Sequence, residues 1–122
     1  MGSEISSSTA TLRNLLEVSR GREEHELFED LLRRPGVRIE RIISQGQTTP
    51  PDRPYVQEWD EWVLILAGSA EVTLEGFGQR SLIPGDHLFI PAGVPHLVIY
   101  TANPTIWLAI HVGQPRPTGS NL

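Results

Sequence analysis

Residues 85–96 place one histidine at a fixed point of a β-structure. Gly85 opens a turn into a short apolar run, and Pro91-Ala92-Gly93 breaks that run. His96 then begins the next run three residues after Gly93. Because this connection is so short, it holds the imidazole at a strand end, where side chains tend to converge in barrels.

Short β-type runs dominate the chain after Gly36. Gly, Pro, Asn or Asp occupies most of the joints between them, as is typical of turns. Many short strands at close spacing, with no helix between them, predict a mainly β fold, either an antiparallel sandwich or a barrel. We expect strands over residues 37–44, 55–59, 62–67, 71–74, 77–83, 87–90, 97–101 and 106–112.

A carboxylate, like His96, lies at the start of a predicted strand. Glu61 lies at the head of the apolar run 62–67, and its neighbours are aromatic and aliphatic. A small β domain that brings Glu61 and His96 together would suit metal binding or proton transfer.

Composition narrows the functional classes. With 122 residues the chain is expected to form one domain, and its formal charge of −5 without a Lys/Arg cluster argues against nucleic acid. The absence of cysteine excludes disulfides, thiolate catalysis and Cys-ligated zinc. The longest apolar run is too short to cross a membrane, and no signal-peptide pattern begins the chain. We therefore expect a cytoplasmic protein with no membrane partner.

The residues before Gly36 follow a different period. Leucine and phenylalanine recur at helical spacing at Leu27, Phe28, Leu31 and Leu32, and Pro35-Gly36 follows as a stop signal. This pattern predicts a short N-terminal helix over about residues 22–34. We expect a flexible N-terminus over residues 1–10, a single domain over 11–113 with its barrel over about 37–112, and a flexible tail over 114–122.

Two glycines, a proline and a histidine are spaced as in the second motif of the cupin family, so the chain resembles that family. Cupins are small double-stranded β-helix or jelly-roll barrels. That motif reads glycine, five residues, proline, one residue, glycine, two residues, histidine, and it is matched by Gly85, Pro91, Gly93 and His96. The first cupin motif ends in glutamate, six residues, glycine, which Glu61 and Gly68 match. The resemblance spans about residues 37–111 and implies a cupin jelly-roll barrel.

The chain departs from the family in the first motif. Tyr55-Val56-Gln57 stands where the family usually has His-x-His, and Tyr100 replaces the asparagine that usually closes the second motif. The Tyr-x-Gln pattern is similar to that of a subgroup of stand-alone bacterial cupins.

The resemblance implies a metal site of which only part is kept. In the family, two first-motif histidines, the glutamate and the second-motif histidine bind a divalent metal. Here Glu61 and His96 match two of these ligands, and Tyr55 and Gln57 take the places of the others. If His111 points inward, two imidazoles and a carboxylate result, a set that suits iron or manganese; otherwise His111 only ends an edge strand. The expected ligands for Fe, Mn, Ni or Zn are Gln57, Glu61, His96 and His111.

Two functional classes remain open. An enzyme would use the metal on a small organic acid or sugar-like substrate, or would work without metal, with Glu61 as base and Tyr55 or His96 as acid. A binding module would hold a small apolar or weakly polar ligand, oriented by hydrogen bonds from Tyr55, Gln57 and His96. Both have a small molecule as partner. A homodimer is also expected, because the run 62–66 is apolar on both faces and cupins are often dimers.

Overall fold

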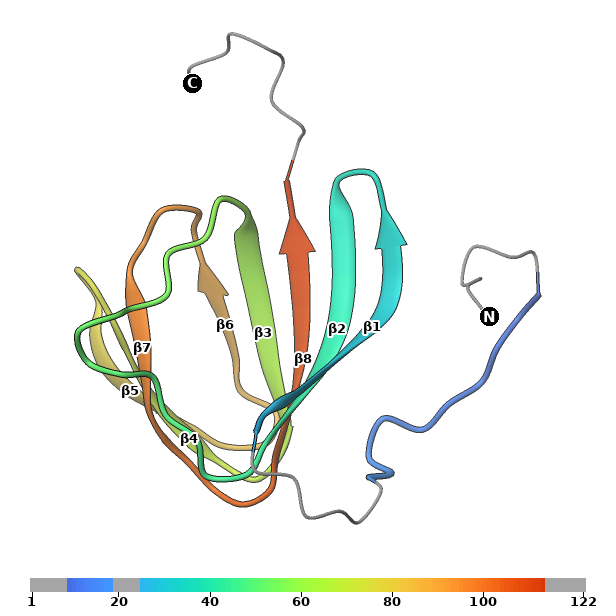
Figure 1. Ribbon diagram of the computed structural model, residues 1–122, viewed down its shortest axis with the longest axis horizontal. Helices are drawn as coiled ribbons and strands as arrows, with labels where there is room; N and C mark the ends of the chain where they lie inside the picture. The colour runs from blue at the N-terminus through green and yellow to red at the C-terminus, as the bar shows by residue number, and fades with distance from the viewer. Residues whose placement is uncertain (1–8, 19–24, 114–122) are drawn as a thin grey trace, which may run out of the picture.

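The computed structural model describes residues 9–18 and 25–113, and within these ranges its regular structure is entirely β (Figure 1). The predicted mainly β, antiparallel fold is confirmed. No helix in the described residues is long and apolar enough to span a membrane. The strands are β1 (Leu27–Arg34), β2 (Val37–Ser44), β3 (Asp60–Ala67), β4 (Ala70–Leu74), β5 (Gly78–Leu82), β6 (His87–Ile90), β7 (His96–Thr101) and β8 (Thr105–Val112).

The strands form two antiparallel sheets that enclose the core between them (Figure 1). The larger sheet has the order β1-β2-β8-β3-β6 and the smaller one β5-β4-β7. Each sheet keeps two free edges in the described part of the chain, so the fold is a two-layer sandwich and the expected barrel does not close. The buried core takes its side chains from both sheets, including Val63 and Ile65 of β3, Val72 and Leu74 of β4, and Trp107 of β8.

The predicted N-terminal helix is wrong over residues 27–34, which form strand β1; residues 22–24 of that prediction lie outside the described residues. β1 pairs antiparallel with β2, and a bulge interrupts the register between Asp30 and Leu32. The bulge shifts the alternation of side chains, so Leu27 and Leu32 face the same side of the sheet. On that side they pair across the strands with Ile43 and Ile39. The helix prediction rested on the spacing of Leu27, Phe28, Leu31 and Leu32, which imitates a helical period, and pairing with the β-branched strand β2 decides the structure instead.

The predicted strand over residues 55–59 is also wrong, because only an isolated bridge joins Tyr55 to His96. The segment that contains Tyr55 runs beside β7 and is not a strand of either sheet. Backbone hydrogen bonds link Tyr55 with His96 in both directions, at 2.9 and 3.0 Å, and the Gly93 amide donates to the carbonyl of Gln57 at 2.8 Å. These bonds hold the segment that carries Tyr55 and Gln57 against the start of β7.

The turn between β3 and β4 depends on a glycine. Gly68 has a φ of +86°, and a Cβ built on it would come within 2.6 Å of Thr105 Oγ1 and also overlap the carbonyl oxygen of Pro104. Gly46 has a similar φ of +94°, but nothing lies within 4 Å of its Cβ position. Alanine substitutions at these two glycines therefore distinguish the effect of backbone strain from that of steric overlap.

We predict that Gly68→Ala lowers the free energy of unfolding by about 2–4 kcal/mol, because it adds overpacking to the strain of a positive φ. Gly46→Ala should cost only about 1 kcal/mol, from backbone strain alone. Urea denaturation of both variants measures the difference. Equal losses in the two variants would contradict the steric account of the Gly68 turn.

Candidate functional site

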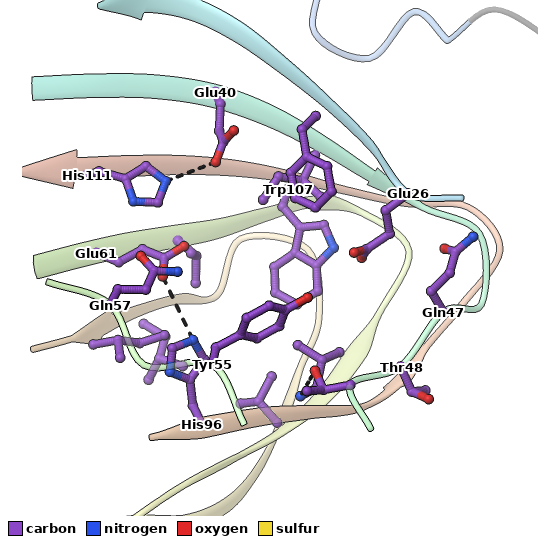
Figure 2. A pocket seen from close by; sticks show the side chains of 18 of the residues that line it. Glu26, Glu40, Gln47, Thr48, Tyr55, Gln57, Glu61, His96, Trp107 and His111 are labelled. Carbon is purple, nitrogen blue, oxygen red and sulfur yellow. Dashed lines mark hydrogen bonds and ion pairs between the residues drawn. The ribbon is translucent and has the colours of Figure 1, made fainter. Parts of the chain in front are cut away.

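A pocket of about 210 Å³ opens between the two sheets (Figure 2). Typical ligand pockets begin at about 300 Å³, so an occupant of this one is small. Its apolar walls include Val63, Val72 and Leu88. Every residue that the sequence proposed for a site lines this pocket: Tyr55, Gln57, Glu61, His96 and His111.

Glu61 and His96 reach the pocket from opposite sheets and face each other. Glu61 lies on β3 and His96 begins β7, and each is only 6% exposed. The Glu61 Oε1 to His96 Nε2 distance is 3.9 Å, which is too long for a hydrogen bond. Glu61 Oε1 is buried and has no hydrogen-bond partner among the described residues.

The turn before β7 sets the orientation of the His96 ring. His96 Nδ1 lies 3.0 Å from the carbonyl oxygen of Val94, and the Val94 amide in turn donates to the carbonyl of Pro91. Because a carbonyl only accepts, Nδ1 carries the hydrogen. In the neutral form of this tautomer, Nε2 carries the lone pair, and it lies 3.9 Å from Glu61 Oε1.

Burial raises the pKa of the Glu61 carboxyl above its usual value. The charges of His111 and His96 act in the opposite direction but do not cancel the cost of desolvation. A buried carboxylate without a hydrogen bond is costly, so the gap between Glu61 and His96 favours an occupant that compensates the charge.

His111 lies in the pocket beside Glu40, a residue that the sequence analysis missed. β8 is the central strand of the larger sheet, so the alternative of an edge histidine is wrong. His111 Nε2 lies 2.9 Å from Glu40 Oε1, and Nη2 of Arg38 donates to the same oxygen at 3.1 Å. Since the carboxylate accepts, Nε2 carries the hydrogen, and only Nδ1 of His111 keeps a lone pair for a ligand. The signal for Glu40 was a charge within the β-branched run 37–44.

Glu40 is a stable anion in this arrangement. Burial raises the pKa of its carboxyl, but the hydrogen bond from His111 and the charge and hydrogen bond of Arg38 outweigh burial and bring the pKa below its usual value of 4.5. The pKa values of Glu40 and Glu61 therefore shift in opposite directions, although each carboxyl lies near a histidine of the same pocket.

Tyr55 and Gln57 come from the segment beside β7. The Tyr55 ring lies 5.6 Å from the His96 ring, centroid to centroid, while its hydroxyl points toward the end of the pocket where Glu26 lies (Figure 2). Burial, with the charge of Glu26, raises the pKa of this hydroxyl above its usual value of 10.0. Tyr55 is therefore a neutral phenol at ordinary pH. Gln57 lines the same pocket as Glu61.

The donor set fits a metal only in part. No three His, Asp or Glu side chains gather as a metal cluster in the described part of the chain. The 3.9 Å gap between Glu61 Oε1 and His96 Nε2 can be spanned by two metal–ligand bonds of about 2.0–2.2 Å each. The unpartnered oxygen and the fixed lone pair thus fit a cation bound by two residues.

Comparison with known proteins identifies the family. The family model described as "Cupin domain" matches residues 40–111, most of the described chain, and the protein belongs to the cupin family. This confirms the predicted family and fold. The Tyr-x-Gln subgroup stays a prediction.

Several solved structures are similar to this chain. A protein from Ralstonia eutropha JMP134, provisionally named mannose-6-phosphate isomerase, is 42% identical over 84% of this chain and 98% of that chain, with a TM-score of 0.80. A cupin superfamily protein from Desulfitobacterium hafniense DCB-2 shares the fold, with a TM-score of 0.65 at 24% identity over 84% of this chain and 98% of that chain.

A third similarity is to the dimethylsulfoniopropionate lyase DddQ of Ruegeria pomeroyi. Its structure is 26% identical over 75% of this chain and 49% of that chain, with a TM-score of 0.64. A stretch of 37 residues is 54% identical to the sequence of the enzyme of that name, but it covers 30% of this chain and only 18% of the lyase. The chain thus spans about half of the lyase structure and matches less than a fifth of the curated sequence.

We predict that Glu40→Gln lowers the free energy of unfolding by about 1–3 kcal/mol at neutral pH, because it removes charge-assisted hydrogen bonds with His111 and Arg38. The pKa of Glu40 is lower in the folded state, so this stabilisation is present above the unfolded-state pKa and is lost as the pH falls through the folded-state pKa. The difference from wild type should therefore shrink in acid.

Urea denaturation at neutral and acidic pH measures this effect, with Glu75→Gln as the matched control at an exposed carboxylate. A Glu40→Gln loss that equals that of the control at neutral pH, or that is unchanged in acid, would contradict the assigned role.

Proposed function

We propose that this cupin domain binds a divalent cation between Glu61 and His96 and acts on a small organic molecule held in the same pocket. The observation that carries this proposal is the buried, unpartnered Oε1 of Glu61, which faces the oriented lone pair of His96 at 3.9 Å. A cation compensates the desolvated carboxylate and uses the free imidazole nitrogen at once.

The residues around this pair have distinct tasks in the proposal. The Val94 carbonyl keeps the His96 ring in the orientation that a ligand needs. Gln57 offers a neutral amide oxygen as a further donor, whereas His111 holds Glu40 through Nε2 and offers only Nδ1. When bound, the cation would supply Lewis-acid chemistry, polarising an oxygen of the substrate.

The substrate class follows from the pocket and from the relatives. The small volume and the mixed polar and apolar walls suit a small organic acid or a sugar-like molecule. The names of the Ralstonia and Ruegeria proteins describe enzymes that act on small polar molecules.

A metal-free function is the second candidate. It is favoured by the donor set, in which Tyr55 and Gln57 replace two of the histidines that the family resemblance implies and no three-residue cluster gathers among the described residues. In this version Glu61, with its raised pKa, exchanges a proton with a bound ligand, and the neutral phenol of Tyr55 provides a hydrogen bond.

Metal titration distinguishes the two candidates. We predict that protein purified without a histidine tag binds one Mn(II), Fe(II), Ni(II) or Zn(II) ion per chain in isothermal titration calorimetry. Glu61→Gln and His96→Ala should each weaken binding at least about tenfold, since each removes one of two ligands. His87→Ala removes a histidine on the opposite face of the sheet and should leave binding unchanged.

Binding weaker than millimolar for every ion would overturn the metal proposal and leave the metal-free function. So would an affinity that survives both Glu61→Gln and His96→Ala. Gln57→His adds an imidazole where the amide now lies, so tighter binding in this variant would place Gln57 within reach of the ion.

We also propose that the protein is a homodimer. Apolar side chains cover the face of the larger sheet that points away from the pocket, where Trp62 pairs across the strands with Phe89 and Ile110. Phe89 is 53% exposed there. Light scattering should give twice the chain mass for the wild type and one chain mass for Phe89→Glu, because a buried charge opposes the contact. A monomeric wild type would contradict the proposal.

A further inference from the structure

His111 is the second histidine of the pocket and lies outside the Glu61–His96 pair. It stands directly opposite Glu61 in the register of β8 and β3, so both side chains leave the same face of the sheet and line the pocket. Of the charges that act on the pKa of the Glu61 carboxyl, that of His111 has the largest effect, which agrees with this neighbourhood. The described residues nevertheless contain no group of three side chains that could hold a metal. His111 therefore needs a role of its own.

The contacts of the His111 ring determine which nitrogen carries hydrogen. Nε2 lies 2.9 Å from Glu40 Oε1 and 3.4 Å from Arg38 Nη2, and Nη2 donates to the same Glu40 oxygen at 3.1 Å. If Nε2 carried a lone pair for Arg38, it would face the carboxylate oxygen as a second acceptor, which is unfavourable. Nε2 and Nη2 are therefore two donors that share one acceptor, and Glu40 fixes the tautomer of His111.

Nδ1 of His111 is left as an acceptor. In Figure 2 the ring lies between Glu40 and Glu61, with Nε2 on the Glu40 side. In the part of the chain that the structure describes, the hydrogen bonds of this ring involve Nε2, and none reaches Nδ1. His111 is only 6% exposed, so a partner for Nδ1 has to enter through the pocket.

Two neighbouring groups of the pocket are acceptors as well. Glu61 Oε1 is unpartnered, and His96 Nε2 carries a lone pair because Nδ1 of that ring donates to Val94. Arg38, which also lines the pocket, is already engaged with Glu40. A cation between Glu61 and His96 would use two of the three acceptors, and Nδ1 of His111 would still need a hydrogen-bond donor.

We propose that His111 determines the specificity of the pocket, because its Nδ1 accepts a hydrogen bond from a hydroxyl group of the bound small molecule. A hydroxyl gives one hydrogen to Nδ1 and keeps two lone pairs, which tolerate a neighbouring cation. An isostere with a methyl group in place of the hydroxyl leaves the buried Nδ1 without a partner and binds more weakly. The inference deepens the proposed function by naming this feature of the substrate, and it rests on that function only for the shared pocket.

Hydroxyacetone and butanone test this specificity, because they differ only in a hydroxyl or a methyl group beside the carbonyl-bearing carbon. We expect protein freed of metal with a chelator to bind hydroxyacetone about fivefold more tightly than butanone, the effect of one hydrogen bond. NMR titration at mildly alkaline pH, where imidazole groups are neutral, measures both affinities. His111→Phe keeps a planar ring but removes both nitrogens, so the preference should be lost. His87→Phe, on the opposite face of the sheet, should keep it.

Heteronuclear NMR of the ring nitrogens of His111 gives a second measurement, which needs no variant. In the ligand-free protein Nε2 should carry the hydrogen and Nδ1 should not. Hydroxyacetone should then shift the resonance of Nδ1, whereas butanone should leave it in place. This readout decides the matter even if His111→Phe does not fold.

Four results would each overturn the inference: equal affinity of the wild type for the two ketones, no binding of hydroxyacetone, a preference that persists in folded His111→Phe, or an Nδ1 resonance that hydroxyacetone leaves unmoved. Titration of the same protein with Zn(II) distinguishes this inference from the metal proposal. A preference for hydroxyacetone without zinc binding would support the role of His111 and reject the cation. Zinc binding without the preference would do the reverse.

Discussion

The hydrogen bond between His96 Nδ1 and the Val94 carbonyl is the constraint on which the site depends. The turn after Pro91 places that carbonyl 3.0 Å from Nδ1, and the bond fixes which nitrogen carries hydrogen. The remaining lone pair then faces Glu61 from the opposite sheet at 3.9 Å. Because the two sheets supply one partner each, packing of the sandwich core sets the gap between them. The site is thus a product of the fold's two layers and of one turn.

The sequence was most informative where local chemistry and tertiary structure agree. The turn residues before β7 and the apolar run of β3 were sufficient to predict where His96 and Glu61 lie. The sequence failed where tertiary contacts decide: a bulge in β1 gave leucine spacings that imitate a helix, so Glu26 was expected on a helix instead of in a pocket. Glu40 was missed because only its pairing with His111 across β2 and β8 makes a buried charge tolerable.

The pocket contains two carboxyl groups whose pKa values shift in opposite directions. Glu40 is paired and its pKa is lowered, whereas Glu61 is unpartnered and its pKa is raised by burial. Such divergence between neighbouring groups is typical of functional sites.

The central claim is that a divalent cation occupies the gap between Glu61 and His96. Anomalous diffraction at the absorption edge of manganese or zinc, from crystals grown with that ion, tests the claim most directly. The account predicts one anomalous peak within bonding distance of Glu61 Oε1 and His96 Nε2, about 2.0–2.2 Å from each. A well-ordered pocket with no peak between these two atoms, or with a peak only at the protein surface, would contradict it.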